Sequence, residues 1–310
     1  MSEPILHHYD TSPYSEKIRA IFGYKRMAWR SVTTPAVAPK PDLVALTGGY
    51  RRAPVLQVGR DIYCDTRLIV RVLDRLQPAP PVVPPRQRLS CLAYASLEQT
   101  LFFATVPVVF QPAGLKYLVE QLGPDAMQQF RQDREALFAG GTARRPNAEY
   151  SRLNFVPLFN AVDVQLGDGP YLLGAEPTLA DFVCYHCAWF VLRNPGTAPL
   201  FEPFRNLLAW AQRMQQLGHG HSSPMSGAAA LDVARQAQDE QPFEGPLLEP
   251  EGLKLGQRVA VNATDYGCEP VVGTLAHASV YELALRRADE RAGEVTVHFP
   301  REGFSAAAVA

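Results

Sequence analysis

Over residues 1–80, short apolar runs of strand length alternate with stretches of helical periodicity. The runs predict β-strands at 5–8, 29–33, 54–58 and 62–64, and the periodic stretches predict helices at 14–22, 43–46 and 65–76. The connection Gly59-Arg60-Asp61 is too short for a crossover, so the last two strands are expected to form an antiparallel hairpin. The pattern therefore predicts the element order βαβαββα.

A proline-rich stretch separates this unit from a long region of helical periodicity. Residues 77–86 contain five prolines without periodicity, which is typical of a stiff linker. Beyond it, one long helix is expected to end or bend at Pro107, and Thr178 and Asp181 form a capping box with a role in folding. Further helices are predicted at 125–138, 148–166, 179–192, 204–217 and 228–238. We therefore assign residues 86–241 to an all-helical domain.

After a second linker at 242–246, the pattern changes to short runs that are β-branched or alternating. They predict four strands at 257–263, 271–276, 281–287 and 294–299. These strands indicate a small antiparallel, barrel-like β module over residues 247–304, to which the sequence assigns no chemistry. His277, His298 and Arg301 are expected on its surface, and the alanine-rich tail 305–310 is expected to fray.

Charge and cysteine content exclude several classes of function. The chain has 310 residues, with 30 basic against 31 acidic, so no global field favours nucleic acid or an anionic membrane. The N-terminus lacks a charged-then-apolar signal pattern, and we expect no apolar run that approaches the roughly 20 residues needed to span a bilayer. Five cysteines indicate no disulfide framework, and Cys184 and Cys187 lie in an apolar helix without a metal-ligand set. We expect a cytoplasmic protein without metal, nucleic-acid or membrane partners.

The first junction between strand and helix is a place where an anion can be held. A strand that ends at Tyr9 and a helix that begins at Pro13 leave the Ser12 hydroxyl beside free amides of the first helical turn. Pro13 suits the first helical position, and Ser12 is the natural N-cap. By itself this pattern favours a purely structural cap. Asp65-Thr66 stands at the start of another predicted helix. These two residues can cap that helix and bind a ligand at the same time.

Three motifs taken together resemble the N-terminal domain of the glutathione S-transferase superfamily. They are Ser12-Pro13-Tyr14-Ser15-Glu16-Lys17-Ile18-Arg19, then Ala53-Pro54-Val55-Leu56, then Asp65-Thr66. The resemblance implies a thioredoxin-like α/β domain over residues 1–80, followed by the all-α bundle domain of the family. It also implies that Pro54 is cis, that the backbone of Ala53 pairs with the cysteinyl part of glutathione, and that Asp65 and Thr66 hold the γ-glutamyl end. Arg52 and the pair Asp-Thr depart from the commoner residues of the family.

The resemblance places Ser12 at the position of the catalytic Ser or Cys. A free thiol has a pKa of about 8.5, so a hydroxyl donor at a helix N-terminus favours the reactive thiolate. Serine in place of cysteine favours conjugation or isomerisation over disulfide exchange. The first hypothesis is therefore a homodimeric transferase that uses glutathione as co-substrate and attacks a small hydrophobic electrophile. The alternative is a non-catalytic protein of the same fold that binds a ligand or a protein partner.

Overall fold

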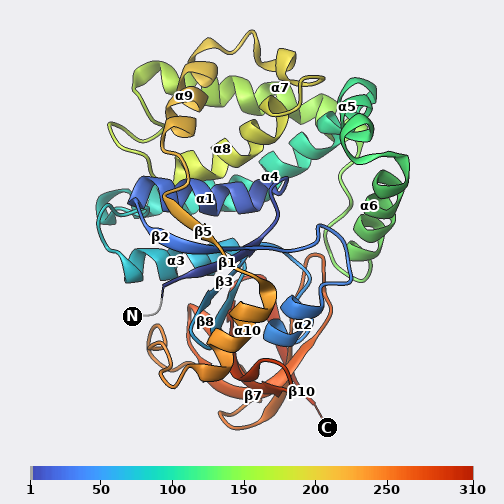
Figure 1. The fold of residues 1–310 in the computed structure, drawn as a ribbon. Helices are drawn as coiled ribbons and strands as arrows, with labels where there is room; N and C mark the ends of the chain where they lie inside the picture. The colour runs from blue at the N-terminus through green and yellow to red at the C-terminus, as the bar shows by residue number, and fades with distance from the viewer. Residues whose placement is uncertain (1–2, 310) are drawn as a thin grey trace.

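The computed structural model describes residues 3–309, which form ten α-helices, several 3-10 turns and one ten-stranded sheet (Figure 1). The helices are α1 (Pro13–Lys25), α2 (Pro41–Thr47), α3 (Thr66–Leu76), α4 (Arg88–Val109), α5 (Pro112–Leu122), α6 (Pro124–Leu137), α7 (Ala148–Gln165), α8 (Leu179–Leu192), α9 (Arg205–Gln216) and α10 (Gly227–Gln236). The strands are β1 (Ile5–His8), β2 (Ala28–Thr33), β3 (Val55–Val58), β4 (Asp61–Cys64), β5 (His221–Pro224), β6 (Arg258–Ala263), β7 (Val271–Ala278), β8 (Glu282–Asp289), β9 (Gly293–Pro300) and β10 (Phe304–Ala308).

The N-terminal part has the order predicted from the sequence, β1-α1-β2-α2-β3-β4-α3. Strand β1 pairs in parallel with β2 and antiparallel with β3, and β3 forms the expected hairpin with β4. Helices α1 and α3 cover one face of this sheet, where Ile18, Phe22 and Leu73 are buried. The expected thioredoxin-like fold is confirmed.

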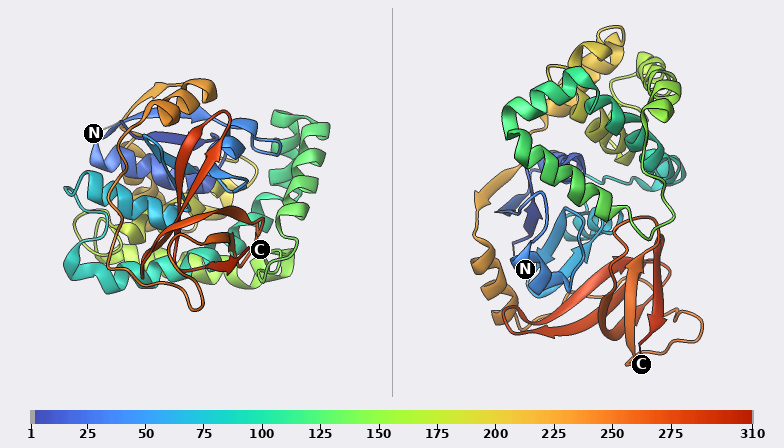
Figure 2. Two further views of the ribbon diagram at one scale, coloured as in Figure 1. Left: turned by 90° about the horizontal axis from the view of Figure 1, so that it is seen from below. Right: turned by 90° about the vertical axis from the view of Figure 1, so that its right-hand side faces the viewer.

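The helical domain lies over α1, on the side of the sheet that α1 and α3 cover (Figure 2). Helix α4 packs against α7 and α8, and α8 packs against α1. Pro107 lies inside the last turn of α4, which continues to Val109, so the predicted end of this helix is nearly right. The predicted capping box forms between Thr178 and Asp181, while α5 has no counterpart among the predicted helices.

The helix α4 also corrects an expectation about apolar runs. The 25 residues Pro85–Val109 have a mean hydropathy of 1.3 in their most apolar window, which is enough by length and composition to cross a membrane. The expectation that no run reaches this length is therefore wrong. A helix packed within a helical domain meets the same criteria, and α4 contacts both α7 and α8.

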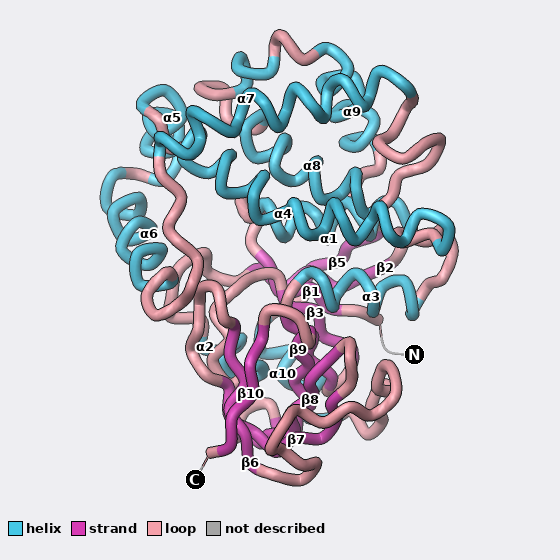
Figure 3. Tube along the Cα trace, turned by 180° about the vertical axis from the view of Figure 1, so that it is seen from behind, coloured by secondary structure: helices cyan, strands magenta, loops and turns pink. Residues whose placement is uncertain are grey.

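The C-terminal strands continue the thioredoxin-like sheet. The strand order is β10-β6-β7-β8-β9-β4-β3-β1-β2-β5, with β6 to β10 joined to one another antiparallel. Strand β9 pairs in parallel with β4, so the predicted β module is an extension of the sheet (Figure 3). The tail expected to fray instead forms β10, because its backbone pairs with β6 from Phe304 to Ala308.

Part of the range assigned to the helical domain returns to the sheet. Strand β5 pairs in parallel with β2 at the edge of the sheet, and α10 packs against α2 and β9. Helices α2 and α10 cover the face opposite to α1 and α3, where a second hydrophobic core forms. That core contains Leu46 of α2, Leu231 of α10 and Phe299 of β9, so it joins three distant parts of the chain.

Candidate functional site

A small polar cleft of about 80 Å³ lies where the thioredoxin-like domain, α4 and the C-terminal strands meet. Its lining residues are Tyr14, Tyr50, Arg52, Ala53, Pro54, Asp65, Thr66, Arg67, Glu98, Gln99, Asp265, Tyr266, Glu302, Gly303 and Phe304. Four of the five site residues predicted from the sequence are among them. The last five lining residues belong to the C-terminal segment, for which the sequence predicted no chemistry.

Ala53, Pro54, Asp65 and Thr66 share one wall of the cleft. The Ala53–Pro54 peptide bond is cis, as the resemblance implies. Asp65 has a φ of 72°, and its Oδ1 accepts a hydrogen bond of 2.9 Å from the amide of Arg67 at the start of α3. Asp65 is thus an N-cap that also faces the cleft, so capping and a ligand contact do not exclude each other here.

Ser12, the fifth predicted site residue, is not among the lining residues. It is the N-cap of α1, its Oγ accepts a hydrogen bond of 3.1 Å from the amide of Ser15, and its side chain is buried. Tyr14, two residues later, lines the cleft instead. Burial raises the pKa of Tyr14 well above its usual value, so this phenol stays protonated and able to donate a hydrogen bond.

A buried ionic cluster borders the cleft through Glu98 and joins the two domains. Lys17 Nζ donates to both carboxylate oxygens of Glu98, at 2.7 and 3.0 Å, and to Thr66 Oγ1 at 3.2 Å. His186 Nε2 lies 2.9 Å from Glu98 Oε1. Burial alone would raise the pKa of Glu98, but Lys17 and His186 outweigh it and hold this pKa at about 2. Burial lowers the pKa of His186, so the neutral imidazole donates its Nε2 proton.

The sequence did not predict this cluster. One signal was present, because Glu98 shares a face of α4 with the buried residues Cys91 and Leu101. A charged residue at such a position requires a buried partner. Which residue supplies that partner depends on how α1 and α4 pack, since Lys17 is 81 positions away in the chain.

Arg52, one of the two departures from the family's pattern, contacts the C-terminal segment. Its guanidinium lies 4.0 Å from the centre of the Tyr266 ring, and its Nε donates to the Tyr266 carbonyl at 3.1 Å. It also forms an ion pair with Asp265 and lies 3.7 Å from Asp65 Oδ2. Burial opposes the charge of Arg52, but these neighbours raise its pKa above the usual value. Arg52 thus links the predicted site to the β6–β7 loop.

Family models identify the two expected domains. The glutathione S-transferase N-terminal domain matches residues 6–81, and the glutathione S-transferase C-terminal domain matches residues 129–213. A GST-like protein from Pseudomonas syringae, known from its crystal structure, is 37% identical with a TM-score of 0.81. The match covers 98% of this chain and 100% of that protein. The chain belongs to the glutathione S-transferase superfamily.

More distant members share the fold alone. A glutathione S-transferase from Rhodospirillum rubrum F11 is 17% identical with a TM-score of 0.51, covering 68% of this chain and 87% of its own. A glutathione S-transferase from Methylobacillus flagellatus, solved with GSH bound, is 16% identical with a TM-score of 0.50. The match covers 70% of this chain and 99% of that protein. A search of curated proteins found no match. The C-terminal strands thus lie within the match to the Pseudomonas syringae protein and outside both family models.

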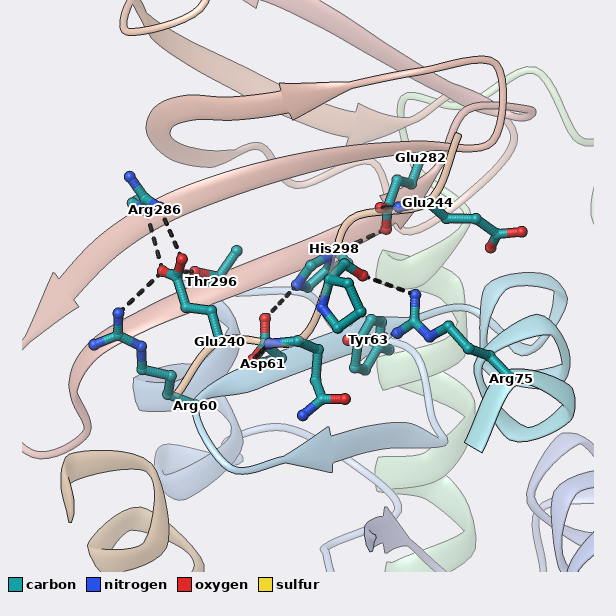
Figure 4. A network of polar contacts seen from close by, with 12 residues as sticks. Arg60, Asp61, Tyr63, Arg75, Glu240, Glu244, Glu282, Arg286, Thr296 and His298 are labelled. Carbon is teal, nitrogen blue, oxygen red and sulfur yellow. Dashed lines mark hydrogen bonds and ion pairs between the residues drawn. The ribbon is translucent and has the colours of Figure 1, made fainter. Parts of the chain in front are cut away.

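In this glutathione S-transferase fold, a second buried cluster lies where the C-terminal strands join β4 (Figure 4). His298, expected on the surface, is fully buried between Asp61 of β4 and Glu282 of β8, so that prediction is wrong. The reason is the pairing of β4 with β9, which no local pattern in the sequence encodes. His277 and Arg301 are half-buried.

Within residues 3–309, no group of three or more His, Cys, Asp or Glu side chains is arranged to hold a metal ion.

Proposed function

We propose that the protein is a glutathione transferase that binds glutathione against Ala53, Pro54, Asp65 and Thr66 and transfers its thiolate to a small hydrophobic electrophile. The observation that carries this proposal is the convergence of these four residues on one wall of a cleft bordered by the first turn of α1. In the reaction, the thiolate sulfur forms a bond to the electrophilic carbon, and the leaving group departs with its electron pair. No metal is required for this step.

Each residue has a role that its contacts support. Asp65 pairs with the γ-glutamyl ammonium, and the Thr66 hydroxyl with the amides at the start of α3 takes the carboxylate. Thr66 Oγ1 already accepts from Lys17, which leaves its own proton free to donate. The Ala53 backbone pairs with the cysteinyl unit.

Ser12 is our first candidate for the residue that stabilises the thiolate. Its Oγ accepts from the Ser15 amide, so its proton remains available for the sulfur. Lowering a thiol pKa by two units takes about 2.7 kcal/mol, which a charge-assisted hydrogen bond and a helix N-terminus supply together. Tyr14 is the second candidate, because its ring lines the cleft and Ser12 does not.

We also propose a homodimer formed through the helical domain. Exposed apolar side chains on α4 and α7 favour it: Leu89 is 82% exposed, and Leu92, Leu153 and Val156 are each more than half exposed. Sedimentation equilibrium of the purified protein tests this point, and a monomer at micromolar concentration would contradict it.

A non-catalytic binding protein is the second candidate function. It is favoured by the small volume of the cleft, about 80 Å³ against roughly 300 Å³ or more for typical ligand sites. In that case the domain holds a smaller ligand or a protein partner, and no thiolate is transferred.

Calorimetric titration with glutathione, followed by a conjugation assay with a chlorodinitrobenzene, separates the two candidates. Ser12→Ala should abolish most of the conjugation, while Ser226→Ala should leave it unchanged. Ser226 is a matched control, because its Oγ caps α10 by accepting from the Ala229 amide at 3.1 Å, away from the cleft. Loss of activity in Tyr14→Phe with full activity in Ser12→Ala would move the donor role to Tyr14. No binding of glutathione by the wild type would favour the non-catalytic protein.

A further inference from the structure

The β6–β7 loop, residues 264–270, enters the cleft from the C-terminal strands. The ring of Tyr266 lies between the Arg52 guanidinium, at 4.0 Å, and the ring of Phe138, stacked at 4.8 Å with an interplanar angle of 15°. Its ring therefore occupies space between the thioredoxin-like domain and the end of α6. Figure 2 shows this loop and the lower end of α6 side by side.

Hydrogen bonds fix the loop to both domains. The amides of Thr142 and Ala143 donate to the carbonyls of Thr264 and Asp265, at 3.0 and 2.9 Å. Gln99 Nε2 of α4 donates to Asp265 Oδ2 at 3.1 Å, and Arg52 pairs with the same carboxyl group. Side chains and backbone thus hold the loop in one position over the cleft.

The position of the loop conflicts with the size of the proposed ligand. The remaining cleft of about 80 Å³ holds a few waters, whereas typical ligand sites measure roughly 300 Å³ or more. Tyr266 and Phe304 from the C-terminal strands face Ala53, Pro54 and Asp65 across this space. The Tyr266 ring, held 4.0 Å from the Arg52 guanidinium, thus borders the space along this wall that the body of a glutathione molecule needs.

We propose that Tyr266 is a specificity-determining residue that limits the size of the thiol ligand the cleft accepts. This inference rests on the proposed function. The ring, held by Arg52 and Phe138, competes with the body of a tripeptide for the same space. Neither family model covers the loop, so this restriction belongs to the C-terminal strands and not to the shared domains.

The test measures glutathione affinity by calorimetry in the full-length protein and three variants. Tyr266→Ala should bind about tenfold more tightly than wild type, since the competing ring is gone. Tyr266→Phe keeps the ring and should bind as wild type does. Tyr281→Ala is the matched control, because the Tyr281 ring lies at the same distance, 4.0 Å, from the Arg71 guanidinium and does not line the cleft.

A larger probe sharpens the comparison. S-hexylglutathione should gain more affinity from Tyr266→Ala than glutathione does, because it needs more room. If Tyr266→Ala does not fold by its thermal transition, Tyr266→Leu replaces it and should bind more tightly by several-fold.

Equal or weaker binding by Tyr266→Ala, or by Tyr266→Leu where it replaces Tyr266→Ala, with clear binding by the wild type, would overturn the inference and leave the proposed function standing. No binding of glutathione by any of the proteins would overturn both. These two failures are distinguished by the wild-type titration alone.

Discussion

His298 Nε2 lies 2.9 Å from Asp61 Oδ1, which ties the last long strand of the chain to the edge strand of the thioredoxin-like domain. The other ring nitrogen of His298, Nδ1, lies 3.0 Å from Glu282 Oε2. All three side chains are buried, and the Tyr63 ring stacks on the imidazole at 4.4 Å. Burial opposes protonation of His298, but the hydrogen bonds to both carboxylates raise its pKa above 6.5. An imidazole whose pKa is raised by two carboxylates therefore joins β4, β8 and β9.

Replacing this imidazole should destabilise the junction. His298→Ala leaves Asp61 and Glu282 buried without their partner, which we expect to cost about 3–5 kcal/mol of unfolding free energy. Urea denaturation measures this loss. His221→Ala, at an exposed position in β5, is the control and should change stability by less than about 0.5 kcal/mol. A loss under 1 kcal/mol in His298→Ala would mean that water or a rearranged chain replaces the imidazole.

The same cluster predicts a pH window. Because the folded pKa of His298 is raised, its stabilising contribution is complete below pH 6.5 and is lost as the pH rises through the folded value. Burial raises the pKa of Glu282, but the hydrogen bond from His298 lowers it more, so the net shift is downward. The stabilising contribution of Glu282 is therefore present above pH 4.5 and is lost on acidification. The stability advantage of wild type over His298→Gln should thus be largest between pH 4.5 and 6.5. Thermal unfolding of both proteins across pH 4 to 9 measures this difference, and a difference that keeps growing as the pH rises above 6.5 contradicts the assignment.

The ionic cluster that borders the cleft predicts an acid response. The pKa of Glu98 is about 2 in the folded protein against 4.5 as a reference, which corresponds to about 3 kcal/mol of stability at neutral pH. That contribution is lost as the pH falls from 4.5 to about 2. Glu98→Gln should therefore be less stable at neutral pH by at least about 3 kcal/mol, since Lys17 is left buried, and the difference should shrink in acid. Glu120→Gln, exposed on α5, is the control.

Asp181 should be among the most sensitive positions in the helical domain. Its carboxylate accepts from the amides of Thr178 and Leu172, each at 2.9 Å, and from Trp210 Nε1 at 3.0 Å. Asp181→Ala leaves these buried donors without an acceptor, and we expect a loss of about 3 kcal/mol or more. Chemical denaturation checks this value. Asp125→Ala, at the exposed start of α6, should cost well under 1 kcal/mol.

A glycine next to the β6–β7 loop offers an independent way to move it. A Cβ atom at Gly141 would lie 1.8 Å from the carbonyl oxygen of Asp265, so Gly141→Ala forces the two backbones apart. We expect a loss of about 1–3 kcal/mol and faster hydrogen exchange across residues 264–270. Mass spectrometry of exchanged peptides measures the effect. Gly167→Ala is the control, because its Cβ would meet only the Asn206 side chain, at an ordinary 3.5 Å. Unchanged exchange in Gly141→Ala would mean that the α6–α7 connection moves instead of the loop.

Local patterns predicted most of the elements, and the resemblance to the superfamily supplied the candidate site residues. Ser12 caps α1, and Asp65 caps α3, because strand ends, prolines and capping residues act over a few positions. Ala53, Pro54, Asp65 and Thr66 meet in one cleft because they lie at the ends of neighbouring elements in the expected order. Local patterns could not predict the cluster of Lys17, Glu98 and His186, since each of these residues lies on a different helix.

The sequence by itself determined the thioredoxin-like order, the helical domain and the strand character of residues 258–300, because hydrophobic periodicity is a local property. The tertiary structure alone decided that β9 pairs with β4, that His298 is buried, and that Tyr266 reaches the cleft. The physical reason is that an open strand edge and a buried charge accept any partner of matching geometry. Only the packed chain selects β9 for that edge and Asp61 and Glu282 for that imidazole.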